Sequence, residues 1–546
     1  MKHILKNELR ILILAALLFL PFLGSVHLFD WDEINFAESA REMLLSGDYF
    51  TVQINYEPFW EKPPMFFWMQ ALSMKIFGIN EFAARFPNAL CGIVTLVAFF
   101  RIGRKIVDVQ FARIWVMIYL GTFLPFLYFK SGIIDPWFNL FIFLAIYRVY
   151  LLATNDSARD NRMNALLAGL FLGFAVITKG PVAIVICVLF FLVILSINKF
   201  RSPIKWKFLL VIFGVVLLVS FSWFGMETIR NGPHFIVEFV QYQIRLLTTS
   251  EAGHGQPFFY HWPVLLFGCF PTSIFMIQAM AKRSNELEVN QVLFRKWMIV
   301  LFWVVLLLFS IVTTKIVHYS SLCYFPLTFL ATLGVYEFIR NRDAKLLYVV
   351  QGLFAVIGVL LATLFMFFPV LFGIKESVSE KLNDEFVQGN LEADVNWAFT
   401  DSLGGLIFLG GVVCFWLIRN RELKSQLLFS SITICAFMST MLIAPKVEAI
   451  SQRANIEFFK QRQNEDCYVE TINYKSYAHY FYAGDPENPL DGLRQKSADD
   501  NWLLYGEIDK TAYFSVKISD VAMLDSVPGI QKLYQKNGFA FYKREP

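Results

Sequence analysis

Three acidic residues, Asp30, Asp32 and Glu33, follow directly on an apolar run that is long enough to enter a membrane. In the segment 34–44 after them, apolar residues recur at helical spacing, and Gly47 is typical of a helix end. The spacing of Asp30 and Glu33 also fits a capping box, in which side chains satisfy free backbone amides at the start of a helix. The acids are therefore either caps of a helix at the membrane surface or acid–base groups of an active site.

Other ionisable residues also lie at the ends of apolar runs. Glu61 and Lys62 stand before two prolines in FWEKPP, where a surface ion pair is the ordinary explanation. Asp135 in IIDPWF ends an apolar run, where an unpaired acid is costly, unless it caps a helix that starts at the next proline. Lys179 in TKGP lies in a short turn, from which its amine can reach the lipid headgroups. His254 lies between two glycines, and a single histidine is usually no ligand.

The elements that must position these residues are membrane spans. The chain has 546 residues, of which 56% are hydrophobic and 17% are charged, whereas soluble domains carry about 25% charged residues. A span needs about 20 apolar residues, and about thirteen runs approach that length. They centre on residues 11–28, 82–100, 111–129, 133–153, 164–178, 182–197, 207–225, 261–281, 296–313, 319–338, 346–372, 402–418 and 426–444. We therefore predict an α-helical polytopic membrane protein.

Lysine and arginine are concentrated in alternate connections between these runs, which predicts that those connections are cytoplasmic. The N-terminus belongs to the same basic set, so the loops 29–81, 227–260 and 374–400 and the C-terminal segment lie on the outer side. All the residues with possible chemistry then share that side: Asp32, Glu33, Glu61, Lys62, Asp135, Lys179, Arg245, His254, Lys315 and His318. The net charge of +4 gives no indication of a nucleic-acid partner.

The C-terminal segment differs from the rest of the chain. CYVETINY, NWLLYG and GFAFYKRE are typical of short strands, and VEAISQRANIEFFKQRQ has apolar residues at helical spacing. We predict two domains: a membrane domain of residues 1–444, with the candidate residues at its outer face, and a small soluble α/β domain of residues 445–546.

This collection of side chains suits a reaction on a charged substrate that is itself in the membrane. A phosphate leaving group needs cations directed at it, and an attacking hydroxyl needs a carboxylate base. The sequence has no dinucleotide-binding glycine motif and no P-loop. Asp30-Trp31-Asp32 formally matches the D-x-D motif of nucleotide-sugar enzymes, but it lies on the outer side, where nucleotide sugars are scarce. We therefore expect no nucleotide cofactor.

The run DEINFAESAREMLLSGDYFTVQINYEPFWEKPPMFFWMQALSMKIFGINEFAARFPNAL resembles the first outer loop of GT-C glycosyltransferases that use polyprenyl-phosphate sugars. TKGP, SWFGMETIRNGPHF and TTKIVHYSSLCYFPL resemble the same family at matching places. The similarity covers roughly residues 10–340 and is closest to the aminoarabinose transferases that modify lipid A, with protein O-mannosyltransferases as more distant relatives. It implies a GT-C fold with helices lying along the outer membrane face. It also implies inverting transfer of a sugar from a polyprenyl phosphate to lipid A, another envelope glycan or a protein, in the bacterial inner membrane.

The resemblance also assigns roles to individual residues. Asp32 matches the catalytic acid of the family, and Glu33 and Asp135 join it as catalytic candidates. Glu61 and His254 match a pair of metal ligands, which implies a divalent ion such as Zn²⁺ or Mg²⁺. The expected contacts with the donor phosphate come from cations: Lys62, Lys179, Arg245, Lys315 and His318. Two positions depart from the family, because Asn35 and Gly255 stand where basic residues are usual.

A transporter or lipid flippase is the alternative function. Transporters place ionisable residues near the middle of the membrane and often contain repeated halves. Here the charges lie in outer loops, and no repeat is apparent. Consumption of a polyprenyl-phosphate sugar by detergent-solubilised protein would distinguish the two functions, because transport cannot occur there.

Overall fold

The computed structural model describes residues 2–155, 157–249, 255–281, 288–341, 345–373, 383–463, 465–484 and 500–546. Each of the predicted apolar runs coincides with a helix or a helix pair. These are α1 (Lys2–Phe19), α4 (Glu81–Ile106), α5 (Val109–Leu120) with α6 (Phe123–Tyr128), α7 (Asp135–Thr154), α8 (Ala158–Lys179), α9 (Val182–Ile197), α10 (Trp206–Asn231), α12 (His261–Gly268) with α13 (Thr272–Ala281), α14 (Val289–Ile311), η2 (Val317–Cys323) with α15 (Tyr324–Arg340), α16 (Tyr348–Gly373), α19 (Phe399–Leu417) and α20 (Arg421–Met438).

Within these ranges, nine helices are long and apolar enough to cross a membrane, and the pair α12–α13, bent by 105°, brings the number to ten. The remaining runs form α1, α5 and α9, which are shorter or carry more charge. The prediction of an α-helical polytopic membrane protein is confirmed.

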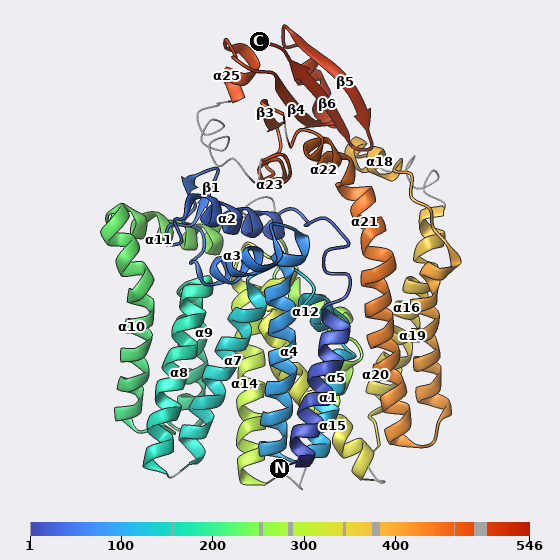
Figure 1. Ribbon diagram of the computed structural model, residues 1–546. Helices are drawn as coiled ribbons and strands as arrows, with labels where there is room; N and C mark the ends of the chain where they lie inside the picture. Colours follow the sequence, from blue (N-terminus) through green and yellow to red (C-terminus); the bar gives the residue numbers. More distant parts are fainter. Residues whose placement is uncertain are drawn as a thin grey trace.

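Three further helices lie across one end of the bundle. They are α2 (Asp32–Ser46), α3 (Met65–Phe77) and α11 (His234–Thr248). Figure 1 shows them at the end that carries the C-terminal domain, while the N-terminus lies at the opposite end. A short hairpin, β1 (Gln53–Ile54) with β2 (Glu57–Pro58), separates α2 from α3. The helices at the membrane surface therefore come from the loops that hold the candidate residues.

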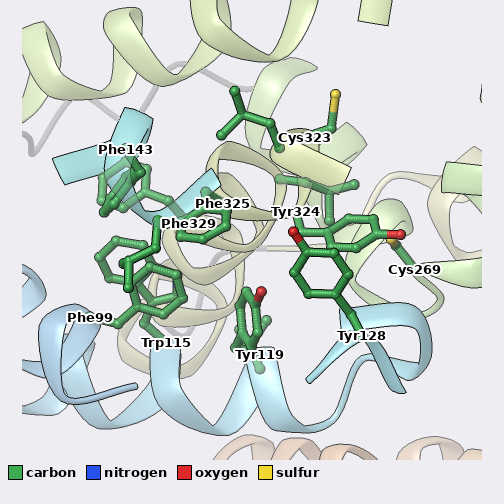
Figure 2. Close-up of a cluster of buried hydrophobic side chains, with 14 of the residues drawn as sticks. Phe99, Trp115, Tyr119, Tyr128, Phe143, Cys269, Cys323, Tyr324, Phe325 and Phe329 are labelled. Atoms are coloured by element: carbon green, nitrogen blue, oxygen red, sulfur yellow. The ribbon is translucent and has the colours of Figure 1, made fainter. Parts of the chain in front are cut away.

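Aromatic packing holds the middle of the bundle together (Figure 2). Phe99 of α4 stacks on Trp115 of α5, with ring centroids 4.2 Å apart, and Phe325 of α15 meets Phe99 edge-on at 5.4 Å. The Trp115 indole donates a hydrogen bond to the Thr328 hydroxyl at 3.1 Å. Lipid tails are as apolar as these side chains, so close packing and hydrogen bonds, rather than removal of water, keep spans together. This core fixes the frame from which α7 and η2 reach the site.

The C-terminal domain continues directly from the last span. The helix passes through a π-helical turn, η3 (Ser439–Ile443), into α21 (Ala444–Ser451), so the predicted boundary at residue 444 lies inside a continuous helix. The short helix α22 (Arg453–Lys460) leads to a mixed sheet of order β3-β4-β6-β5, in which only β3 and β4 are parallel. Its strands are β3 (Tyr468–Ile472), β4 (Ala512–Lys517), β5 (Ile530–Lys536) and β6 (Phe539–Arg544).

Helices cover the rest of this sheet. They are α18 (Glu385–Leu391), α23 (Ala478–Ala483), α25 (Asp500–Tyr505), η4 (Ile518–Asp520) and α26 (Val521–Asp525). The prediction that NWLLYG forms a strand is wrong, because this segment is the helix α25. Leu503 and Leu504 are both buried in the domain core, whereas neighbouring strand residues point to opposite faces. A short apolar run carries too little periodicity to separate the two structures.

The C-terminal domain binds the segment before α2 by hydrogen bonds and ring packing. The Leu28 amide donates to the Tyr482 hydroxyl at 2.8 Å, and the Gln452 side chain donates to the Leu28 carbonyl at 2.8 Å. The Trp31 ring packs against Tyr477 with centroids 5.6 Å apart. The start of α2 is therefore held between the membrane bundle and the C-terminal domain.

Candidate active site

Asp32 is the first residue of α2, and its side chain does not cap the helix. Trp31 occupies the N-cap position, and no side chain there accepts a hydrogen bond from the helix. The Asp32 carboxylate instead points away to His318, with Oδ2 3.2 Å from Nε2. Gly47 ends the helix with φ +73°, as its sequence position predicts. The capping-box alternative is therefore wrong.

His318 lies between two carboxylates. It belongs to η2, and its Nε2 is 3.7 Å from Asp135 Oδ2 as well as close to Asp32. Asp135 is the first residue of α7 rather than its cap, and it is almost completely buried, at 2% exposed. The two acids, far apart in the sequence, therefore face one histidine.

Lys179 completes this group and does not extend to the lipid headgroups. Its Nζ lies 2.5 Å from Asp135 Oδ1 and 4.7 Å from the centre of the Tyr319 ring. Lys179 is the last residue of α8, and Gly180 follows with φ +89°, a conformation that other residues rarely adopt. This turn reverses the chain into α9 and leaves the lysine directed at the N-terminus of α7.

Lys62 enters from the opposite wall. Its two prolines lead into α3 and hold the loop, and its Nζ lies 3.1 Å from the Tyr242 hydroxyl and 4.6 Å from the centre of that ring. Within the part of the chain that the structure describes, Lys62 forms no ion pair. Its positive charge is therefore available to an anionic ligand.

Glu33 is held in a buried ion pair. Both of its carboxylate oxygens accept bonds from the Arg85 guanidinium, at 3.0 and 2.7 Å, and the Gly132 amide donates to Oε1 at 2.5 Å. The Phe29 amide donates to Oε2 at 2.9 Å. With both oxygens engaged, Glu33 is placed to join α2, α4 and the loop before α7 rather than to take a proton from a substrate.

A cavity of about 340 Å³ lies among these side chains. Its walls come from the start of α2, the loop before α3, the starts of α7 and η2, the end of α8 and one face of α11. The lining residues are Phe29, Asp30, Trp31, Asp32, Glu33, Asn35, Phe36, Glu61, Lys62, Ile133, Ile134, Asp135, Lys179, Tyr242, Leu246, Thr314, Ile316, His318 and Tyr319.

Two predicted site residues, Arg245 and Lys315, are not among these walls. The Arg245 guanidinium lies 5.7 Å from the ring centre of the cavity residue Tyr242. Lys315 is buried, and its Nζ donates to the Val312 carbonyl at 2.6 Å. His254 lies outside the described residues, so its predicted pairing with Glu61 stays a prediction.

The electrostatic surroundings keep Asp32 ionised. Burial alone would raise the pKa of Asp32, but the hydrogen bond from His318 and the charges of His318, Lys62 and Lys179 together bring that pKa below its usual value. A carboxylate that stays charged at neutral pH accepts hydrogen bonds and protons but donates none. The cavity therefore presents a charged carboxylate and, at Lys62, an ammonium group that forms no ion pair with any residue that the structure describes.

Sequence reasoning missed three residues that shape the site. Tyr242 and Tyr319 support Lys62 and Lys179. Tyr319 lies in the run TTKIVHYSSLCYFPL, which resembles the family, but the sequence predicted no role for it, and nothing distinguishes Tyr242 from the many other aromatic residues of the chain. Arg85, the partner of Glu33, did carry a signal. It is an arginine inside an apolar helix, and such residues are rare and usually have a buried acidic or carbonyl partner.

Comparisons with known proteins agree with this architecture. A sequence family described as dolichyl-phosphate-mannose-protein mannosyltransferase matches residues 61–223. Undecaprenyl phosphate-alpha-4-amino-4-deoxy-L-arabinose arabinosyl transferase of Photorhabdus laumondii is 29% identical over 64% of this chain and 62% of its own length. The enzyme of the same name from Edwardsiella ictaluri is 28% identical, over 58% of this chain and 57% of its own. The chain therefore matches about three fifths of the length of these relatives.

The fold likeness extends further than the sequence likeness. The crystal structure of ArnT from Cupriavidus metallidurans bound to undecaprenyl phosphate superimposes with a TM-score of 0.78. The match covers 98% of this chain and 97% of ArnT, at 16% sequence identity. The apo form of the same protein gives a TM-score of 0.74. These matches confirm the predicted GT-C fold.

Proposed function

We propose that this multi-pass membrane protein with the GT-C fold transfers a sugar from a polyprenyl-phosphate donor to an acceptor at the membrane surface. The observation that carries the proposal is the pairing of two groups in one cavity, the ionised Asp32 and the unneutralised Lys62. A base and a phosphate-binding cation are the two groups that such a transfer needs.

Lys62 binds the donor phosphate. It meets only a tyrosine hydroxyl and ring among the described residues, so a phosphate displaces a weak partner and gains a full charge interaction. The negative charge on this phosphate grows as the bond to the sugar breaks, and a fixed cation stabilises the growing charge. Lys62 therefore lowers the barrier to departure of the polyprenyl phosphate.

Asp32 acts on the acceptor. Its carboxylate accepts the proton of an acceptor hydroxyl while the hydroxyl oxygen attacks the anomeric carbon, and the carbon–oxygen bond to phosphate breaks on the opposite face. This is the geometry of inverting glycoside hydrolysis with the acceptor in place of water, so the sugar inverts. The hydrogen bond from His318 holds the carboxylate in position during the attack.

Lys179 and His318 support this arrangement from the side. Both were predicted to bind the donor phosphate, but each contacts a carboxylate, Lys179 that of Asp135 and His318 those of Asp32 and Asp135. We propose that they orient the two acids and leave the phosphate chiefly to Lys62. Arg245 and Lys315 are not among the residues that line the cavity, so we propose that they contribute positive charge near the phosphate rather than a wall of its site.

A divalent ion at Glu61 and His254 is a separate part of the proposal. Glu61 lines the cavity next to Lys62, which suits an ion that screens phosphate charge. His254 lies outside the described residues, so the pair is not placed. No cluster of three or more histidine, cysteine or acidic side chains with metal-binding spacing occurs in the described part of the chain.

The names of the relatives suggest undecaprenyl phosphate as the carrier and an envelope glycolipid such as lipid A as the acceptor. We propose a bacterial inner-membrane protein with its N-terminus in the cytoplasm and its C-terminal domain outside. The alternative, a transporter or flippase, fits less well. Asp32 begins α2, Asp135 begins α7 and Lys62 lies just before α3. The helices α2 and α3 lie across the end of the bundle rather than near its middle.

Substitution of Asp32 tests the proposal. Purified protein in detergent receives lipid A and undecaprenyl phosphate carrying 4-amino-4-deoxy-L-arabinose, mannose or glucose, and release of undecaprenyl phosphate is measured. Asp32→Asn keeps the shape but removes the proton-accepting charge, so the rate should fall by roughly 10²–10⁴. Asp30→Asn, two residues away and also at the cavity wall, should cost much less. Near-normal transfer by Asp32→Asn would show that Asp32 is not the base.

A further inference from the structure

The walls of the cavity include two buried hydrogen-bond acceptors that have no donor among the described residues. Asn35 Oδ1 and Asp135 Oδ2 have no hydrogen-bond partner among the described residues. Both side chains are 2% exposed, and both line the cavity. Buried polar atoms are nearly always paired with protein or ordered water. A molecule bound in the cavity could supply the missing hydrogen-bond donors.

The two acceptors lie beside the reacting groups. Asn35 is three residues after Asp32 in α2, so the two side chains lie on the same face of the helix. Asp135 shares His318 with Asp32. Lys179 is already paired with Asp135, whereas Lys62 is supported by Tyr242 of α11 and forms no ion pair among the described residues. The cavity thus has two open acceptors at the starts of α2 and α7, and Lys62 is the lysine of its walls without a carboxylate partner in the described part of the chain.

The chemistry of a polyprenyl-phosphate sugar divides in the same way. Its phosphate offers only acceptor oxygens at neutral pH, and its lipid tail offers no polar group. Only the sugar carries hydrogen-bond donors, on its hydroxyl or amino groups. With the phosphate at Lys62, the sugar faces the two open acceptors.

We infer that Asn35 and Asp135 determine sugar specificity by accepting hydrogen bonds from donor groups on the ring of the transferred sugar. The inference rests on the proposed function and adds a specificity site to it. Asn35 is a neutral amide where the family resemblance leads one to expect a basic residue. A basic side chain would offer donors in place of an acceptor, so this chain should select a different sugar substituent. The cavity volume, at the small end of the usual range for ligand sites, suits one sugar unit.

The test separates recognition of the sugar from recognition of the carrier. Asn35→Leu is compared with wild type in two assays: the KM for the sugar-linked donor that wild type consumes, from the panel above, and inhibition by undecaprenyl phosphate alone. Loss of the acceptor leaves a sugar donor group unpaired, so we expect KM to rise about tenfold to hundredfold. Inhibition by the sugar-free carrier should stay within about twofold of wild type, because the carrier does not reach Asn35.

Ser39→Ala is the matched control. Ser39 is one helical turn further along α2, is buried, and has a hydroxyl without a partner among the described residues, but it does not line the cavity. This variant should leave both measurements unchanged. If Asn35→Leu weakens binding of the sugar-linked donor and of the free carrier equally, the inference is overturned. It is also overturned if Asn35→Leu, like Ser39→Ala, changes neither measurement. A wild-type protein that consumes no donor would instead overturn the proposed function.

If Asn35→Leu does not fold, Asn35→Ser supplies the second measurement. A serine hydroxyl is too short to reach the same ring group but remains polar, so the selective rise in KM should persist in protein that purifies normally. For a sugar donor that lacks the relevant hydroxyl, neither substitution should change KM. If both substitutions raise KM for this deoxy sugar donor as much as for the normal one, a hydrogen bond from that hydroxyl to Asn35 is contradicted.

Discussion

Arg85→Met should destabilise the end of the bundle that carries α2 and α3 more than any surface substitution. The Arg85 guanidinium makes five hydrogen bonds, two to Glu33 and three to the backbone carbonyls of residues 23, 26 and 27, at 2.7–3.0 Å. Both members of the ion pair are buried, with side chains 5% and 7% exposed. Methionine keeps the approximate length of the chain and removes every donor.

The loss of stability in Arg85→Met follows from the groups that lose their partner, the buried Glu33 carboxylate and three backbone carbonyls. Breaking a buried pair by removal of one partner costs about 3–5 kcal/mol, and three lost carbonyl bonds add about 0.5–1.5 kcal/mol each. The sum, about 4.5–9.5 kcal/mol, is a large part of the 5–15 kcal/mol that typically stabilises a protein. Adding Glu33→Met removes the unpaired buried charge, so the double variant should recover about 1–3 kcal/mol.

The pair also makes stability depend on pH. Burial alone would raise the pKa of Glu33, but the charge and hydrogen bonds of Arg85 bring it below the ordinary 4.5. A lowered folded-state pKa contributes stability above the unfolded value, and the contribution is lost as pH falls through the folded value. Wild type should therefore become less stable as the pH drops below about 4.5, and the double variant should lose this component.

Thermal inactivation in detergent measures the effect, because membrane proteins commonly unfold irreversibly and their half-lives report stability. The half-life should decrease in the order wild type, double variant, Arg85→Met. Arg101→Met is the matched control, since Arg101 makes a two-bond pair with Glu8 in which the arginine side chain is 62% exposed, and such pairs contribute about 0–1 kcal/mol. Equal half-lives for the two arginine variants, or a double variant weaker than Arg85→Met, would refute the reasoning. If the Glu33→Gln variant has a normal thermal inactivation half-life but no longer transfers sugar, Glu33 is a catalytic residue instead.

Three other predictions address the metal, pH and topology. Replacing either Glu61 or His254 by alanine should lower the divalent metal content of purified protein equally, as measured by elemental mass spectrometry, and unchanged content in both would leave them as ordinary loop residues. Because the pKa of Asp32 is lowered from 3.8, its protonation should not slow transfer until the pH falls below that value; a decline near neutral pH that shifts in Asp32→Glu would contradict this. A reporter active only in the cytoplasm should be silent when fused after Pro546 and active after Arg419, and the reverse pattern would invert the proposed orientation.

Hydropathy predicted the spans well because a membrane leaves few alternatives for a run of about 20 apolar residues. The distribution of basic residues among the loops also correctly predicted that Asp32, Asp135 and Lys179 lie at the same end of the bundle. The actual partnerships, such as Lys179 with Asp135, depend on how α7 and α8 pack, and charge patterns do not encode that packing.

The failures have physical reasons too. NWLLYG is too short for its periodicity to separate helix from strand. Asp30 and Glu33 fit a capping box by spacing, but Glu33 finds a stronger partner in Arg85, which lies about fifty residues later in the chain. Tertiary partners of this kind override local patterns.

The grip of the C-terminal domain on the segment before α2 has a consequence for biosynthesis. Tyr482 and Gln452, which hold Leu28, leave the ribosome more than 400 residues after the loop that they hold. At about 5–20 residues per second, synthesis of the intervening chain takes roughly 20–90 s. During that interval the nascent segment before α2 lacks these two hydrogen bonds. The candidate site therefore acquires its complete support only near the end of translation, after the last predicted span has been synthesised.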